Sequence, residues 1–342
     1  MADRFGISLN GLHISLDSDG GDNSYVSHAH SDHWSHSSRR IISSDETLAL
    51  IGGREKAEMP KGMTLFNAGH ILGSTQLGAE LDGGSFVYTG DIKLKDGLTT
   101  NGADVRECDL LMIEGTYGSP EFLFPPREET YSSMEKWVKE NSESIIVFGG
   151  YSVGKAQELI LFLNRHCGMT PVVSERIERV CSVYDQFGVR LDRIPAGTEE
   201  ARELMRSPFA AVIPHHLVCP SLSTGLSEIY GRKTMTALAT GWGVRHKYPV
   251  DAVFPLSDHA DFNELLLYIE RASPKEIICV HGNKKKFAKE LIKRGYNARG
   301  WDSSFQPNTA ENHVRGLFAK KSASFQATLL PAGPFQSDKV LL

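Results

Sequence analysis

A short segment near the N-terminus concentrates side chains that bind metal ions. It contains His28-x-His30-x-Asp32-His33, which places four metal-capable side chains in six positions. Alternate residues of an extended segment share a face, so His28 and His30 can bind one ion while Asp32 and His33 point toward a second. Imidazole and carboxylate ligands without cysteine are typical of a catalytic zinc site that keeps one position open for water. The segment therefore predicts two neighbouring metal sites.

Two later loops offer further ligands. His70 lies in Gly69-His70 and Asp91 in Thr89-Gly90-Asp91, and both follow strand-like runs. The two oxygens of Asp91 can reach two different ions, which would hold a metal pair at the roughly 3.5–4 Å spacing that phosphoryl transfer favours. Either residue alone would be weak evidence, but both fit the sites predicted from the first segment.

The elements that position these residues follow from the apolar pattern. Short apolar runs end abruptly in polar or glycine-rich residues at 110–113, 145–148, 210–213, 235–239 and 275–280. These runs predict buried strands with functional loops at their ends. Helix-like segments follow two of them, at 153–165 and 284–294. This strand–turn–helix alternation predicts a layered α/β fold.

Composition indicates an ordinary globular protein. Of 342 residues, 40% are hydrophobic and 23% charged, and the net charge of −5 provides no global basic field, so any nucleic-acid site must be local. The five cysteines form no CxxC pair and are interpreted as buried thiols. No apolar run approaches the roughly 18 residues that a membrane span needs, which predicts a cytoplasmic protein without membrane contact.

The metal-binding motifs closely resemble those of the metallo-β-lactamase superfamily. His28-x-His30-x-Asp32-His33 matches its signature, while His70 and Asp91 match its third and fourth motifs. Asp17 is similar to the acidic residue that ends the first-motif strand and orients neighbouring ligands.

Three further motifs resemble the β-CASP branch of this superfamily. They are Glu114 in Ile-Glu-Gly-Thr-Tyr, His259 in Ser-Asp-His-Ala-Asp and His281 in Val-His-Gly-Asn, in the family order. The resemblance implies one ion held by His28, His30, His70 and Asp91. It implies a second ion held by Asp32, His33, His281 and Asp91.

The resemblance also implies the domain organisation. The expected fold is a metallo-β-lactamase αββα sandwich with an inserted small α/β β-CASP domain. The predicted boundaries are 1–124 and 249–300 for the two parts of the sandwich, 125–248 for the insertion and 301–342 for a C-terminal extension. Association through that extension is left open.

A second set of residues predicts contacts with substrate. The segment containing Ser152, Gly154 and Lys155 follows a strand and opens a helix, a junction whose free backbone N–H groups and positive dipole end suit a phosphate. A glycine turn that merely joins strand to helix is the alternative. Ser257, beside the motif histidine, is the fourth predicted contact. The His215-His216 pair is assigned no role, because adjacent residues on a strand face opposite ways.

These residues also predict a mechanism. Two zinc ions would provide a hydroxide nucleophile and clamp the substrate oxygens. The predicted catalytic residues are His259, Glu114 and Asp32. His259 would act as general acid or phosphoryl contact, with Glu114 orienting it. Glu114 as the partner of a metal ligand is the alternative. Manganese and iron share this ligand chemistry and remain alternative metals.

The function implied by the resemblance is a nuclease. Members of the branch process RNA or trim DNA ends, and a DNA exonuclease is favoured slightly over an RNA-processing exo- or endonuclease. A small-ester hydrolase is disfavoured because such enzymes lack Glu114, His259 and His281 in this order. A catalytically inactive nucleic-acid-binding subunit is disfavoured because every expected ligand is intact.

Overall fold

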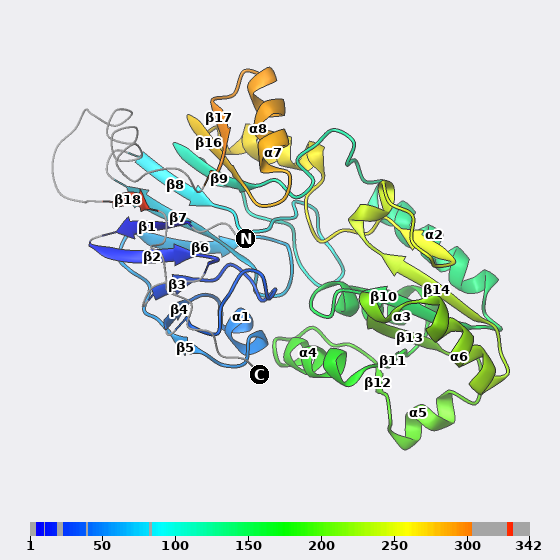
Figure 1. The fold of residues 1–342 in the computed structure, drawn as a ribbon. Coiled ribbons are helices and arrows are strands. Elements are labelled where there is room, and N and C mark those ends of the chain that lie inside the picture. The colour runs from blue at the N-terminus through cyan, green and yellow to red at the C-terminus, as the bar shows by residue number, and fades with distance from the viewer. Residues whose placement is uncertain are drawn as a thin grey trace, which may run out of the picture.

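Three six-stranded sheets organise the chain. The computed structural model describes residues 5–9, 11–18, 23–38, 40–81, 84–302 and 327–330. Two sheets form one lobe, the third forms an inserted lobe, and the lobes face one another (Figure 1). This is the mixed α/β architecture that the sequence predicts. The first lobe is called the catalytic lobe because it carries the predicted metal ligands.

The first sheet has the strand order β18-β1-β2-β3-β4-β5. Strand β1 pairs antiparallel with β2 and β18, whereas β2 to β5 are parallel. Most of the predicted extension 301–342 lies outside the described residues, but β18 belongs to it. The strands are β1 (Phe5–Leu9), β2 (Leu12–Leu16), β3 (Asn23–Tyr25), β4 (Arg40–Ile42), β5 (Glu55–Lys56) and β18 (Ala327–Leu330).

The second sheet has the order β17-β16-β9-β8-β7-β6. The pairs β6–β7 and β7–β8 are antiparallel, whereas β8, β9, β16 and β17 run parallel. The strands are β6 (Met63–Asn67), β7 (Thr75–Leu81), β8 (Gly84–Tyr88), β9 (Leu110–Glu114), β16 (Glu276–Val280) and β17 (Ala298–Gly300).

Side-chain alternation along these strands builds the sandwich. On β16, Ile278 and Val280 pack against the first sheet, while Ile277 and Cys279 pack under helices α7 (Phe262–Ala272) and α8 (Lys284–Lys293). Helix α1 (Asp45–Leu50) packs beside the first sheet through a separate apolar cluster. The result is two sheets between helical layers.

The third sheet is entirely parallel and forms the inserted lobe. Its order is β12-β11-β13-β10-β14-β15, with helices on both faces. The strands are β10 (Ile145–Gly150), β11 (Val172–Val173), β12 (Ile194–Pro195), β13 (Ala210–Pro214), β14 (Thr234–Ala239) and β15 (Ala252–Phe254). One face packs against α2 (Arg127–Glu140), α3 (Lys155–Cys167) and α4 (Glu175–Gln186). The other packs against α5 (Glu199–Leu204) and α6 (Pro220–Tyr230), and two short 3-10 helices are η1 (His215–Leu217) and η2 (Gly241–Val244).

The predicted elements can be compared directly with these. The five predicted strands correspond to β9, β10, β13, β14 and β16, and the two predicted helices to α3 and α8. Strand β15 pairs with β14, so the third sheet extends past the expected insertion end at residue 248. The domain boundaries themselves stay a prediction.

The strand register fixes where the site lies. Glu114 ends β9 opposite Val280 at the end of β16, and Tyr88 ends the neighbouring β8, so their carboxyl ends meet at one edge of the second sheet. In open parallel sheets this edge is where ligands bind. The corresponding edge of the third sheet turns toward it (Figure 1).

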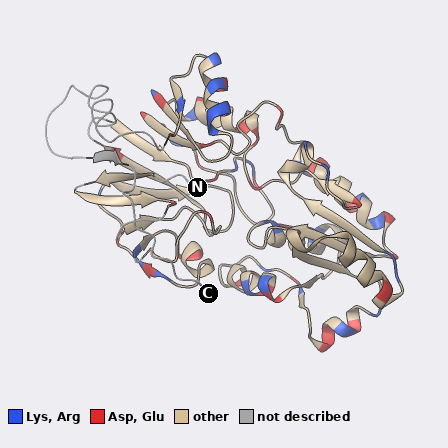
Figure 2. Cartoon of the chain, viewed as in Figure 1, with Lys and Arg blue, Asp and Glu red and all other residues tan. Residues whose placement is uncertain are grey.

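Charges of both signs are spread over both lobes, as the net charge suggests (Figure 2). Among the described residues, no helix is long and apolar enough to span a bilayer.

Candidate metal centre

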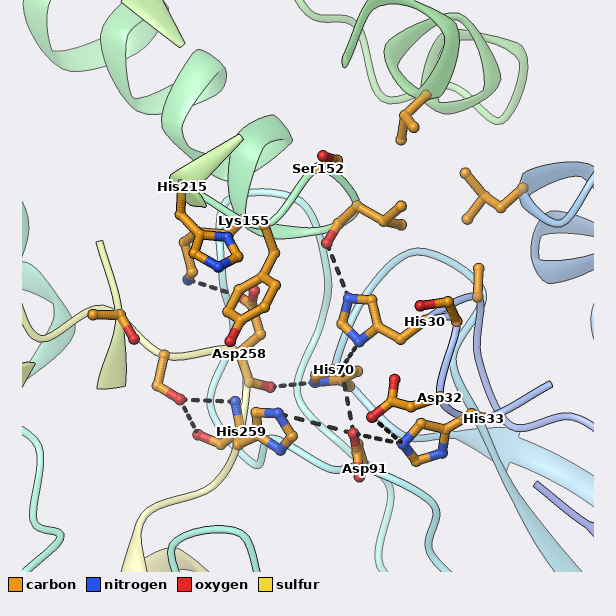
Figure 3. Close-up of a pocket in the computed structure, with 18 of the residues that line it drawn as sticks. His30, Asp32, His33, His70, Asp91, Ser152, Lys155, His215, Asp258 and His259 are labelled. Atoms are coloured by element: carbon orange, nitrogen blue, oxygen red, sulfur yellow. Dashed lines mark hydrogen bonds and ion pairs between the residues drawn. The ribbon is translucent and has the colours of Figure 1, made fainter. Parts of the chain in front are cut away.

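Four side chains from three loops converge at the edge of the catalytic lobe. His28 and His30 follow β3, His70 lies between β6 and β7, and Asp91 follows β8. One ligand atom from each lies within 4.8 Å of the others. His28, His70 and Asp91 are buried. This is the set predicted for the first ion, of which Figure 3 labels His30, His70 and Asp91.

Hydrogen bonds determine which nitrogen each imidazole turns toward this group. His70 Nδ1 lies 2.8 Å from the carbonyl oxygen of Asp258, and His30 Nε2 lies 3.1 Å from that of Val153. A carbonyl oxygen only accepts, so both of these nitrogens carry the proton. His70 Nε2 and His30 Nδ1 therefore present lone pairs to the group.

The same reasoning applies to His28. The Ser27 hydroxyl donates to Asp17 at 2.5 Å, so it accepts from His28 Nδ1 at 2.9 Å. The lone pair of His28 Nε2 then lies 3.0 Å from His30 Nδ1, which is 3.1 Å from His70 Nε2.

Three lone pairs that face one another need a cation between them. Protonation does not provide it, because burial lowers the pKa of His28 and His70 well below the ordinary value. Asp91 Oδ1 is buried and has no hydrogen-bond partner within the described part of the chain. Three neutral imidazoles and a carboxylate are a ligand set that zinc accepts, so the residues fit the predicted metal.

A second group contains Asp17, His33 and His281. Asp17 accepts from the backbone N–H of Ser27 at 2.7 Å, from His33 Nδ1 at 3.0 Å and from the Tyr88 hydroxyl at 2.7 Å. The Tyr88 hydroxyl proton points at Asp17, so His281 Nε2 donates to Tyr88 at 3.0 Å. Asp17 thus orients candidate ligands of both ions, the arrangement predicted for it.

The remaining predicted ligand of the second ion lies apart. The Asp32 side chain is 81% exposed and its Oδ2 is 3.9 Å from His33 Nε2. Asp32 belongs to no ligand group among the described residues. Its predicted metal-binding and catalytic roles stay predictions.

Electrostatics link the two groups through Asp91. Burial raises the pKa of Asp91 to about 6, against the attraction of nearby His33 and His259. Burial also acts to lower the pKa of His33, but the charge of Asp91 and the contact with Asp17 outweigh it and raise that pKa to about 10. A metal ion would replace the proton on His33 as the partner of Asp91.

His259 lies beside the ligands without belonging to the first two groups. Its Nδ1 donates to both oxygens of Glu114 at 3.1 Å, which is the predicted orienting contact, and its Nε2 lies 3.9 Å from Asp91 Oδ2. Burial lowers the pKa of His259, but the charges of Glu114 and Asp91 outweigh it and raise the pKa to about 9. Asp91, Glu114 and His259 also form a third possible ligand group, so both predicted readings of Glu114 stay open.

The predicted substrate contacts require a correction. The backbone N–H of Gly154 donates to Gln157 Oε1 at 2.8 Å, so it is not a free donor. Lys155 is 2% exposed, and its Nζ binds Glu158 at 2.6 Å and Asp258 at 2.8 Å. Both donors therefore already form hydrogen bonds inside the protein. Neither is available to a phosphate, so the predicted substrate contacts of Gly154 and Lys155 are wrong.

The two serines behave differently. Ser257 is buried and its hydroxyl accepts from the backbone N–H of His259 at 3.0 Å, so it fixes that turn. Ser152 is partly exposed and lines the cavity. Of the four predicted contacts, Ser152 is the one placed to meet a substrate without breaking an internal bond.

Both lobes line one cavity of about 850 Å³. From the inserted lobe it receives Tyr151, Arg176, Arg179 and His215, which the sequence reasoning did not assign to the site. Tyr151 adjoins the predicted Ser152, and this adjacency was the available signal. No comparable signal was available for the two arginines of α4, because a charged helix face is ordinarily solvated.

Comparisons with known proteins agree with this geometry. The family described as "Zn-dependent metallo-hydrolase RNA specificity domain" matches residues 248–302. A "Probable DNA ligase" of Opitutus terrae is 34% identical over 301 residues, covering 80% of this chain and 28% of that protein. The "5' exonuclease Apollo" of Gallus gallus is 27% identical over 283 residues, covering 75% of this chain and 58% of that protein.

Two further likenesses extend the comparison. The "Transcription termination factor FttA" of Methanocaldococcus jannaschii is 26% identical, covering 66% of this chain and 45% of that protein. A protein of unknown function from Enterococcus faecalis V583 has the same fold, with a TM-score of 0.54 and 16% identity over 82% of this chain and 79% of that chain. The chain thus spans between about a quarter and three fifths of the lengths of these three curated relatives.

The sandwich, the inserted lobe and the histidine-rich centre describe an α/β protein with a candidate metal centre, and the matched family is described as zinc-dependent metallo-hydrolases. The chain belongs to the metallo-β-lactamase superfamily, in its β-CASP nuclease branch.

Proposed function

We propose that the protein is a two-zinc nuclease that hydrolyses phosphodiester bonds of a nucleic-acid strand, with DNA strand ends as the favoured substrate. The convergence of the lone pairs of His28, His30 and His70 with Asp91 carries this proposal. His33 and His281, two of the ligands predicted for the second ion, lie in one group, and His33 Nε2 lies 3.4 Å from Asp91 Oδ2, which supports a second ion beside the first.

Zinc bound at this centre would supply Lewis acidity toward phosphoryl oxygens and lower the pKa of water to about 7. The chain's own contribution to proton transfer is His259. Its Nδ1 is held by Glu114, which leaves Nε2 facing the ligand cluster and the cavity. The raised pKa favours the protonated form, which a general acid needs to protonate the leaving oxygen.

An RNA-processing nuclease is the second candidate. The family match over residues 248–302 is described by RNA specificity, which favours RNA. The exonuclease Apollo and the DNA ligase relative favour DNA. The centre itself does not distinguish these substrates, because its ligands are suited to the phosphodiester that both share.

A cleavage assay tests the proposal. Matched end-labelled single-stranded DNA and RNA are incubated with zinc-loaded protein, chelated protein and the variants His259→Ala and His246→Ala. His246 is an exposed histidine that does not line the cavity, so it is the matched control. Stepwise, zinc-dependent loss of DNA that requires His259 and not His246 is expected. Preferred RNA cutting would establish the second candidate, and no cleavage of either strand by zinc-loaded protein would contradict both.

A further inference from the structure

Two aromatic rings of the inserted lobe form a shelf beside the metal centre. Gly150 pairs with Pro214 at the ends of β10 and β13, so the next residues, Tyr151 and His215, emerge side by side. Their ring centroids lie 4.5 Å apart at an angle of 47°. Figure 3 shows His215 on the wall of the cavity, near Lys155. We call this pair the aromatic shelf.

The exposure of the shelf separates it from core packing. Tyr151 is 47% exposed, whereas Tyr117, which also lines the cavity, is 3% exposed. Tyr117 packs against Phe124 and Trp242 at centroid distances of 4.9 Å. The ring of Tyr151 instead meets His215 and lies 6.2 Å from the ring of His30, and Tyr151 lines the cavity.

The shelf is electrically neutral. Burial lowers the pKa of His215, with a further contribution from His216, so the imidazole is uncharged at neutral pH. A tyrosine side chain is uncharged at neutral pH, so Tyr151 adds no charge to the shelf. An uncharged aromatic surface offers little to a phosphate, but it suits the flat face of a nucleobase.

We propose that Tyr151, backed by the ring of His215, stacks on one nucleobase of the bound strand next to the metal centre. This inference rests on the proposed nuclease function and adds a base-binding site to it. Stacking uses the face that every base shares, so the site accepts all bases and requires only that a base be present.

A binding experiment isolates the shelf from catalysis. The full chain is kept in chelator to prevent cleavage, and its affinity for a fluorescein-labelled ten-nucleotide thymidine strand is measured by anisotropy. Tyr151→Ala is expected to weaken binding by about tenfold, within the range that base–aromatic stacking contributes. Tyr151→Phe keeps the ring and is expected to bind like the wild type. His215→Ala is expected to give a smaller loss, because Tyr151 loses the ring behind it.

An abasic scan identifies the base. One abasic residue is placed at each position of the strand in turn, and one position is expected to weaken wild-type binding most. In Tyr151→Ala the loss at that position should disappear, because the ring that the base met is gone. An unchanged abasic profile in Tyr151→Ala, or wild-type affinity in that variant, would contradict the proposal that Tyr151 stacks on a base. Failure of the nuclease proposal is read separately, as absence of cleavage by zinc-loaded wild type.

Discussion

Both lobes turn the carboxyl ends of parallel strands toward the cavity, and the two edges can be compared. The catalytic edge carries buried polar groups that lack partners. Three imidazole lone pairs face one another, and Asp91 Oδ1 has no hydrogen-bond partner among the described residues. At the inserted edge the buried charge already has partners, because Lys155 forms ion pairs with Glu158 and Asp258. The candidate reactive groups thus lie on one edge, and under the proposed function the other edge shapes and holds the nucleic-acid strand.

The largest effect should come from removing the carboxylate at the centre of the catalytic edge. Asp91 Oδ2 lies 3.4–3.8 Å from ring nitrogens of His28, His33 and His70, so Asp91→Asn removes a charge that belongs to the first ligand group and lies beside His33 of the second. We expect bound zinc, measured by mass spectrometry, to fall to a small fraction of the wild-type content and cleavage to be abolished. Full zinc content in this variant would show that Asp91 is not a ligand.

A smaller loss should separate His259 from the ligands. His259→Ala is expected to lower kcat by roughly 10²–10⁴-fold, the usual contribution of a general acid, with zinc content unchanged. The two quantities are measured on the same preparation. If zinc is lost in parallel with activity, His259 belongs to a metal site, as its grouping with Asp91 and Glu114 allows.

The inserted edge should respond in stability. Lys155→Met leaves Asp258 and Glu158 buried with one partner fewer, which costs about 3 kcal/mol of unfolding free energy. Urea unfolding of zinc-free protein measures this loss. Lys139→Met, which breaks an exposed pair with Glu135, is the control and should leave the midpoint unchanged. Equal midpoints for both variants would contradict the structural role of Lys155.

The pH dependence of the zinc-free protein sharpens the contrast further. The folded-state pKa of His259 is raised to about 9, above the ordinary 6.5, so its stabilising contribution is complete below about pH 6.5 and is lost as pH rises through 9. The urea midpoint should therefore decrease between about pH 7 and about pH 10, and the decrease should be larger for the wild type than for His259→Asn. An identical fall in both proteins would show that this histidine gains no proton affinity on folding.

The smallest effect concerns charge at the mouth of the cavity. Arg176 and Arg179 of α4 are exposed, line the cavity and form no ion pair within the described ranges. Arg179→Ala should weaken strand binding modestly and lower the slope of log affinity against log salt by roughly 0.7, the contribution of one phosphate contact to a single strand. Anisotropy titrations at several salt concentrations measure the slope, and an unchanged slope would place the strand elsewhere.

The sequence predicted the catalytic edge well because its information is local. His28, His30 and His33 lie within six positions, and the strand ends that bring Asp91, Glu114 and His281 to them follow from simple apolar runs. The exception is Asp32, which the turn exposes. Local spacing cannot show which way a side chain in such a turn points.

The inserted edge could not be predicted in the same way. Whether the Lys155 side chain is free or paired depends on Asp258, which lies 103 positions further along the chain. It also depends on burial that arises when the lobes pack. His215 was set aside by an argument about strands, but β13 ends at Pro214 and His215 begins a 3-10 turn. The alternation of strand side chains therefore does not apply to it.

One contact joins the two edges directly. The His30 ring, in the catalytic lobe, donates its Nε2 proton to the carbonyl of Val153 in the inserted lobe. Separating the lobes would break this bond and free the ring to reorient or change tautomer. Suppose that zinc binds the oriented ring more tightly than the free ring. The contact between the lobes then strengthens zinc binding, and thermodynamic reciprocity requires that zinc strengthen the contact by the same free energy. Under that condition, the contact between the two lobes should be harder to break in the zinc-loaded protein than in the zinc-free one.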